Sequence, residues 1–129
     1  MNRNLDPDFS RELTRRGLEA AERLRVPESP KWLVFRGKCL VLLGDLDAGC
    51  QLFDRCVASY PDAIFGRIDS AICALRDPDL RDAQEAAFER ALELSVRPEH
   101  ANAAAKNLEE HRRWKASGYA GQFQGTIVY

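Results

Sequence analysis

The fold is decided by residues 30–61, which read PKWLVFRGKCLVLLGDLDAGCQLFDRCVASYP. Apolar residues recur at helical spacing on both sides of Gly44-Asp45, which predicts one helix before this break and one after it. Gly44 suits the position just after a helix end. Pro30 suits a first helical turn and Pro61 marks the next break. The stretch therefore predicts two antiparallel helices joined by a tight turn.

Prolines and apolar stripes divide the rest of the chain in the same way. The spacing predicts six helices, over about residues 6–25, 29–43, 45–60, 62–76, 79–96 and 98–115. No alternation of period two occurs before the tail, so we predict an all-α chain with one helical domain over residues 1–117. Residues 118–129 form a flexible or extended tail, because three glycines disfavour a helix. This tail is either disordered or packed on an apolar surface of its own or a neighbouring molecule.

Composition limits the possible partners. The chain has 129 residues, 45% of them hydrophobic and 30% charged, which is an ordinary mixture for a folded domain. The 19 Lys and Arg residues nearly balance the 20 Asp and Glu residues, so no overall charge attracts nucleic acid or an acidic membrane. We find no signal peptide and no apolar run long enough to cross a bilayer. We therefore expect a cytoplasmic protein that makes no use of a membrane.

The four cysteines, Cys39, Cys50, Cys56 and Cys73, lie among apolar residues and form no C-x-x-C pair. This spacing lacks the usual zinc and redox motifs. We predict four buried free thiols, no metal site and no cofactor.

The predicted hairpins repeat. Ala71 follows Gly37 by 34 residues, and Phe88 follows Phe53 by 35 residues. With two helices per unit, this period resembles that of tetratricopeptide repeats over about residues 30–98. The first unit has the family's small and aromatic residues in its second helix, whereas Gln84 replaces the expected small residue in the second unit. The resemblance implies a short α-solenoid of about six helices, paired as tetratricopeptide-like antiparallel hairpins.

In that family the first helix of each hairpin lines a concave groove. The resemblance implies the following groove residues for a partner: Val34, Lys38, Val41, Phe65, Ile68, Asp69 and Ile72. This set is mostly apolar and suits an amphipathic helix or an apolar peptide. Lys38 and Asp69 stand where the family's carboxylate-binding members have asparagines, which argues against a chaperone-tail clamp. The same apolar residues could instead be core that a flanking helix covers.

The favoured function is a non-catalytic interaction module, an adaptor or small chaperone-like protein that binds an apolar segment of another protein. No glycine-rich phosphate loop, G-x-S-x-G element or H-E-x-x-H element is present, so we expect no catalytic residue and no enzyme. One alternative is a homo-oligomeric structural or secretion-system component, with the tail residues Phe123, Ile127, Val128 and Tyr129 as anchors. Another is a nucleic-acid-binding regulator that uses the basic residues Arg11, Arg15, Arg16, Arg112 and Arg113.

Overall fold

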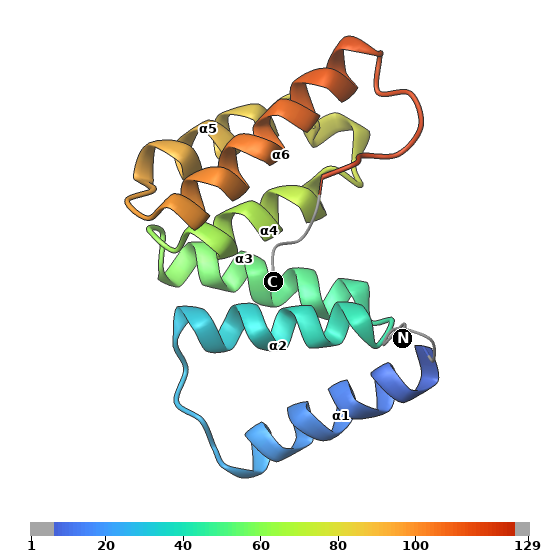
Figure 1. Cartoon of the computed structure of the whole chain (residues 1–129), viewed down its shortest axis with the longest axis vertical. Coiled ribbons are helices and arrows are strands. Elements are labelled where there is room, and N and C mark those ends of the chain that lie inside the picture. Colours follow the sequence, from blue (N-terminus) through green and yellow to red (C-terminus); the bar gives the residue numbers. More distant parts are fainter. Residues whose placement is uncertain (1–6, 126–129) are drawn as a thin grey trace.

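The computed structural model describes residues 7–125. This part of the chain contains six α-helices, one short 3₁₀-helix and no strand (Figure 1), which confirms the all-α prediction. In chain order the elements are α1 (Pro7–Arg23), α2 (Pro30–Leu42), α3 (Leu46–Ser59), α4 (Ile64–Ala74), η1 (Pro78–Leu80), α5 (Gln84–Leu94) and α6 (Pro98–Ala116).

Five of the predicted helices begin and end within two residues of the observed bounds, and the fifth helix is the exception. We predicted its start at about residue 79, but α5 begins at Gln84. The carboxylate of Asp77 accepts a hydrogen bond of 3.0 Å from the backbone N–H of Asp79. Because this cap starts the separate turn η1, the chain reaches α5 only after a further turn.

The turn between α2 and α3 follows from its residues. Gly44 has a φ of +92°, a conformation that glycine adopts without strain. The N–H of Gly44 bonds the carbonyl of Val41, and the N–H of Asp45 bonds the carbonyl of Leu40, which together close the end of α2 as a Schellman motif. The carboxylate of Asp45 then accepts from the N–H of Ala48 at 3.2 Å and caps α3.

The helices pack mainly against their neighbours in the chain, as Figure 1 shows. From α2 to α6, each helix packs on the next one, and α1 packs on the outer side of α2. Some contacts also skip a helix, because α2 touches α4 and α4 touches α6. The row therefore has α1 at one end and the pair α5 and α6 at the other.

Glycines allow two of these helices to cross closely. A Cβ atom added at Gly49 of α3 would lie 2.7 Å from the carbonyl oxygen of Gly37 in α2. A Cβ atom added at Gly37 would lie 2.5 Å from the ring of Phe53, which is fully buried. The crossing of α2 over α3 thus depends on side-chain-free positions at Gly37 and Gly49.

The structure corrects our prediction of four free thiols. Cys50 of α3 and Cys73 of α4 form a disulfide, with their Cα atoms 5.9 Å apart. Their separation of 23 residues matches no short-range motif. The pair arises because α3 and α4 are packed neighbours, which the cysteine spacing alone does not reveal. Cys39 and Cys56 are free and buried, as predicted.

The described part of the tail packs on its own chain. Residues 117–125 contain no helix or strand. The indole N–H of Trp114 donates to the carbonyl of Ala120 at 3.1 Å, and the Tyr119 ring meets the Trp114 ring edge-on at 4.9 Å. The ring of Phe123 lies parallel to that of Phe88 in α5, with 6.2 Å between centroids. The other predicted anchors, Ile127, Val128 and Tyr129, lie outside the described residues.

Candidate ligand groove

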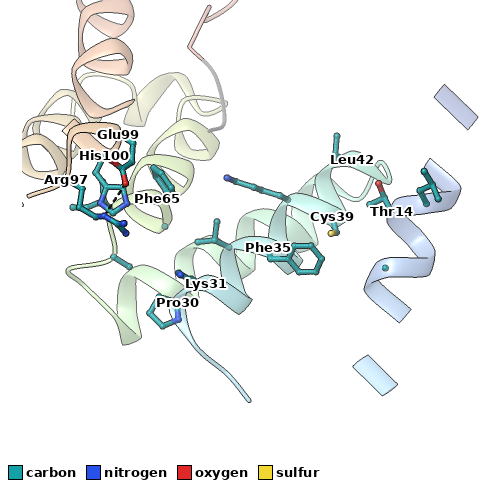
Figure 2. Close-up of a pocket in the computed structure, with 17 residues that line it drawn as sticks. Thr14, Pro30, Lys31, Phe35, Cys39, Leu42, Phe65, Arg97, Glu99 and His100 are labelled. Carbon is teal, nitrogen blue, oxygen red and sulfur yellow. Dashed lines mark ion pairs between the residues drawn. The ribbon is translucent and has the colours of Figure 1, made fainter. Parts of the chain in front are cut away.

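A groove of about 800 Å³ runs along α2 and is bordered by α1, the start of α4 and the start of α6 (Figure 2). Its lining is mostly apolar. The lining residues are Leu13, Thr14, Gly17, Pro30, Lys31, Val34, Phe35, Lys38, Cys39, Leu42, Ala63, Ile64, Phe65, Gly66, Arg97, Glu99 and His100.

Three large apolar side chains of this groove are strongly exposed. Phe35 and Leu42 of α2 have 44% and 47% of their surface in solvent, and Leu13 of α1 has 53%. Figure 2 shows the ring of Phe35 on the side of α2 toward the α1 segment that carries Thr14, and Leu42 at the end of α2. An exposed apolar cluster inside a groove is typical of a binding surface for another macromolecule.

One cation interrupts this apolar lining. The ammonium nitrogen of Lys38 lies 5.4 Å from the centroid of the Phe65 ring. It also lies 3.9 Å from a carboxylate oxygen of Asp69, and only 12% of the Lys38 side chain is exposed. Lys38 is thus held at the groove wall between an aromatic face and a buried carboxylate.

Asp69 is fully buried behind Lys38. Within residues 7–125, neither of its carboxylate oxygens receives a hydrogen bond. Burial raises the pKa of Asp69 to about 7, and the positive charge of Lys38 opposes that rise. Burial likewise lowers the pKa of the Lys38 ammonium, and the Asp69 carboxylate opposes that change. Burial therefore has the larger effect on the charge of Asp69, and Lys38 is the neighbour that favours its ionised form.

The remaining polar groups of the groove gather where α6 begins. Arg97 and Glu99 form an ion pair of 3.1 Å. The ring of His100 meets the ring of Phe65 edge-on, with 4.7 Å between centroids. Figure 2 shows these side chains together beside Phe65, so this end of the groove is polar while the end near Phe35 is apolar.

The structure divides the predicted site residues into two groups. Val34, Lys38 and Phe65 line the groove together, whereas the other four do not. Ile68 and Asp69 have no exposed surface, so they cannot touch a ligand directly. The remaining two are partly buried. Ile72 packs against the core formed by α4, α5 and α6, and Val41 packs against the cluster around Phe53.

Sequence reasoning missed Leu13, Phe35, Leu42 and His100. The repeat pattern began near residue 30, so it gave α1 no place in the groove. Nearly every position from Trp32 to Leu43 is apolar or small, so spacing alone cannot separate the inner side of α2 from the groove side. The available signal was the four-residue spacing of Val34, Lys38 and Leu42, which places all three on one side of a helix.

Most of the basic residues that suggested nucleic acid form ion pairs with nearby carboxylates. Arg15 and Arg16 both pair with Glu12, at 2.8 Å and 3.0 Å. Arg112 pairs with Glu89 at 3.0 Å, and Arg113 pairs with Glu109 and Glu110. Phosphate binding would have to compete with these internal pairs.

The described residues offer neither a metal-binding cluster nor a membrane-spanning helix. Between residues 7 and 125, no group of three or more His, Cys, Asp or Glu side chains is arranged to hold a metal ion. No helix in the same range has both the length and the apolar character that crossing a bilayer requires. In comparisons with known proteins, the chain matches no protein-family model, no curated protein and no solved structure.

Proposed function

We propose that this chain is a tetratricopeptide-like interaction module that binds an apolar helix or peptide of a partner protein in the groove along α2. The pairing of α2 with α3 and of α4 with α5 supports the proposal, as does the close approach of Gly37 to Phe53. The contacts of α2 with α4 and of α4 with α6 also support it, because successive first helices are neighbours in such a stack. In this proposal α6 is the first helix of an incomplete third unit.

The exposed apolar cluster in the groove carries the proposal. Phe35, Leu42 and Leu13 line the groove and remain about half exposed. Covering the exposed half of one such side chain would contribute about 0.7–1.5 kcal/mol to binding. An amphipathic helix laid against α2 would cover all three at once. The role is non-catalytic, requires no cofactor and would be that of a cytoplasmic adaptor or small chaperone-like protein.

The alternatives have less support. Self-association through the tail would need Phe123 as an anchor, but this ring already contacts Phe88 and Trp114 of its own chain. Nucleic-acid binding would need free cationic side chains, but Arg15 and Arg112 are engaged in ion pairs.

A peptide-binding measurement tests the proposal. Fluorescently labelled amphipathic helices, with leucines spaced to form one apolar face, are titrated with the protein and followed by anisotropy. We expect Phe35→Glu to weaken binding at least about tenfold, because it places a charge in the apolar part of the groove. Val96→Glu is the matched control, since Val96 is 93% exposed and lies outside the groove.

Two outcomes of this measurement would contradict the proposal. If the wild-type protein binds none of the peptides, the groove is not a helix-binding site. Equal binding by wild type and Phe35→Glu, with unchanged circular dichroism, would place any binding elsewhere on the molecule.

A further inference from the structure

We propose that the helix accepted by the groove carries one carboxylate on its apolar face, that Lys38 binds this carboxylate, and that Asp69 takes up a proton as the helix binds. This inference rests on the proposed function and specifies the chemistry of the partner: an amphipathic helix with a single Asp or Glu between apolar residues.

The spacing of α2 supports a central carboxylate. Val34, Lys38 and Leu42 follow one another at four-residue intervals and all line the groove. The cation therefore has an apolar side chain one helical turn away on each side. A partner helix with apolar, acidic and apolar residues at the same spacing would match this order.

The position of the Lys38 ammonium also supports a carboxylate ligand. Its nitrogen lies over the Phe65 ring and its side chain is 12% exposed, so the charge is held at the groove surface and is poorly hydrated. A charge-assisted hydrogen bond in such surroundings is stronger than one in water. A neutral acceptor at this position would make a weaker bond, because only the donor would be charged, and a cationic group would make none.

Charge complementarity around the groove points the same way. The charged side chains of the lining are Lys31, Lys38, Arg97 and Glu99, three cations against one carboxylate. Glu99 pairs with Arg97 and the buried Asp69 pairs with Lys38, so the positive charge beyond these pairs is that of Lys31, joined by that of Lys38 once Asp69 is protonated. An acidic helix is therefore attracted and a basic one repelled.

Asp69 explains why a proton is taken up. Two groups from neighbouring helices face it: the Lys38 ammonium from α2 and the neutral Cys56 thiol from α3, whose own pKa is raised by burial and by Asp69. A ligand carboxylate at Lys38 adds a second negative charge next to that ammonium. Asp69 is fully buried and receives no hydrogen bond within residues 7–125. Its ionised form is therefore less stable than that of the ligand carboxylate, and Asp69 is the group that takes up the proton.

The proton uptake has a defined pH dependence. The pKa of Asp69 is about 7, so this group is mostly protonated at pH 6 and mostly ionised at pH 8. Binding of an acidic helix requires the protonated form. The affinity should therefore fall about tenfold between these two pH values.

Two peptides that differ at one side chain, Glu or Gln, test the inference. The first is an amphipathic helix with a central Glu, and the second has Gln at that position. Affinities are measured by anisotropy at pH 6 and pH 8 for the wild type, Lys38→Met and Asp69→Asn. His100→Gln is the control, because His100 also lines the groove.

We expect the wild type to bind the Glu peptide about tenfold more tightly than the Gln peptide at pH 6, and to lose most of that preference at pH 8. Lys38→Met should have no preference for the Glu peptide, because the carboxylate then lacks its cation. Asp69→Asn should prefer the Glu peptide at both pH values, and His100→Gln, whatever its affinity, should show the same change in preference between pH 6 and pH 8 as the wild type. Calorimetry of the wild type in buffers of different ionisation enthalpy gives a readout without variants: nearly one proton taken up per Glu peptide at pH 8, and none with Gln.

The outcomes separate the two proposals. Equal affinity of the wild type for both peptides at pH 6, or no proton uptake with the Glu peptide, overturns this inference and leaves groove binding intact. A pH dependence that persists in Asp69→Asn also overturns it. Failure of both peptides to bind overturns the proposed function itself.

Discussion

Asp69 gives the structure a stability that depends on pH. Its pKa in the folded state is about 7, well above its ordinary value of 3.8, because burial disfavours the charged carboxylate. The folded state therefore binds this proton more tightly than the unfolded state does. The stabilisation is complete below about pH 4 and is lost as the pH rises through about 7.

We expect the free energy of unfolding to fall by about 2 kcal/mol relative to Asp69→Asn as the pH rises from about 5 to about 7. Urea denaturation of both proteins at four or more pH values measures this difference. The comparison with Asp69→Asn removes the contributions of the other carboxylates, which the two proteins share. A difference that stays constant with pH would show that Asp69 titrates normally in the folded protein.

At the same scale, the sequence predicts some groove residues and not others for a physical reason. Helical spacing places Lys38 and Phe65 on the first helices of the two hairpins, and both line the groove. Ile68 and Asp69 lie on the same helix as Phe65, but neither has exposed surface. Which of these positions is covered depends on how the neighbouring helices cross α4. The spacing of apolar residues along one sequence contains no information on that crossing.

At the scale of the element, the crossing of α2 and α3 depends on Gly49. A methyl group there would lie 2.7 Å from the backbone oxygen of Gly37, which cannot move without shifting α2. We expect Gly49→Ala to destabilise the protein by about 1–3 kcal/mol through overpacking. The measurement is chemical denaturation followed by circular dichroism.

Gly17→Ala is the matched control for that variant. Gly17 also lies inside a helix, but a Cβ atom there would meet no heavy atom within 4 Å. Alanine should therefore stabilise α1 by about 0.5–1 kcal/mol, its ordinary advantage over glycine in a helix. If both variants shift stability in the same direction and by the same amount, the proposed crossing is not what limits position 49.

The positions of the helices were more predictable from the sequence than the contacts between them. Apolar spacing and prolines locate the helices because both act within a few residues. The start of α5 was misplaced where Asp77 caps a separate turn before it. The disulfide between Cys50 and Cys73 could not be predicted, because it depends on the packing of α3 on α4 rather than on any local pattern.

At the scale of the whole molecule, a row of helices leaves an apolar surface at each end unless something covers it. Beyond α6, the described tail provides that cover: Phe123 and Tyr119 pack against the core that includes Phe88 and Trp114. The side chain of Tyr119 also donates a hydrogen bond to Asp82, which joins the tail to the segment before α5. We therefore expect the tail to stabilise the helical row, and its removal should expose the side chain of Trp114 to water.

We expect Phe123→Ala to lower the free energy of unfolding by about 1–2 kcal/mol, because the ring is partly buried between Phe88 and Trp114. Measured in a Trp32→Phe background, so that Trp114 alone reports, the emission should shift to longer wavelength as water reaches the indole. Gln122→Ala, which changes an exposed neighbour, is the control and should leave both quantities unchanged. Sedimentation of the same proteins distinguishes the tail's two possible roles. An unchanged mass with lower stability supports packing within one chain, whereas a lower mass for Phe123→Ala would show that the ring joins two copies.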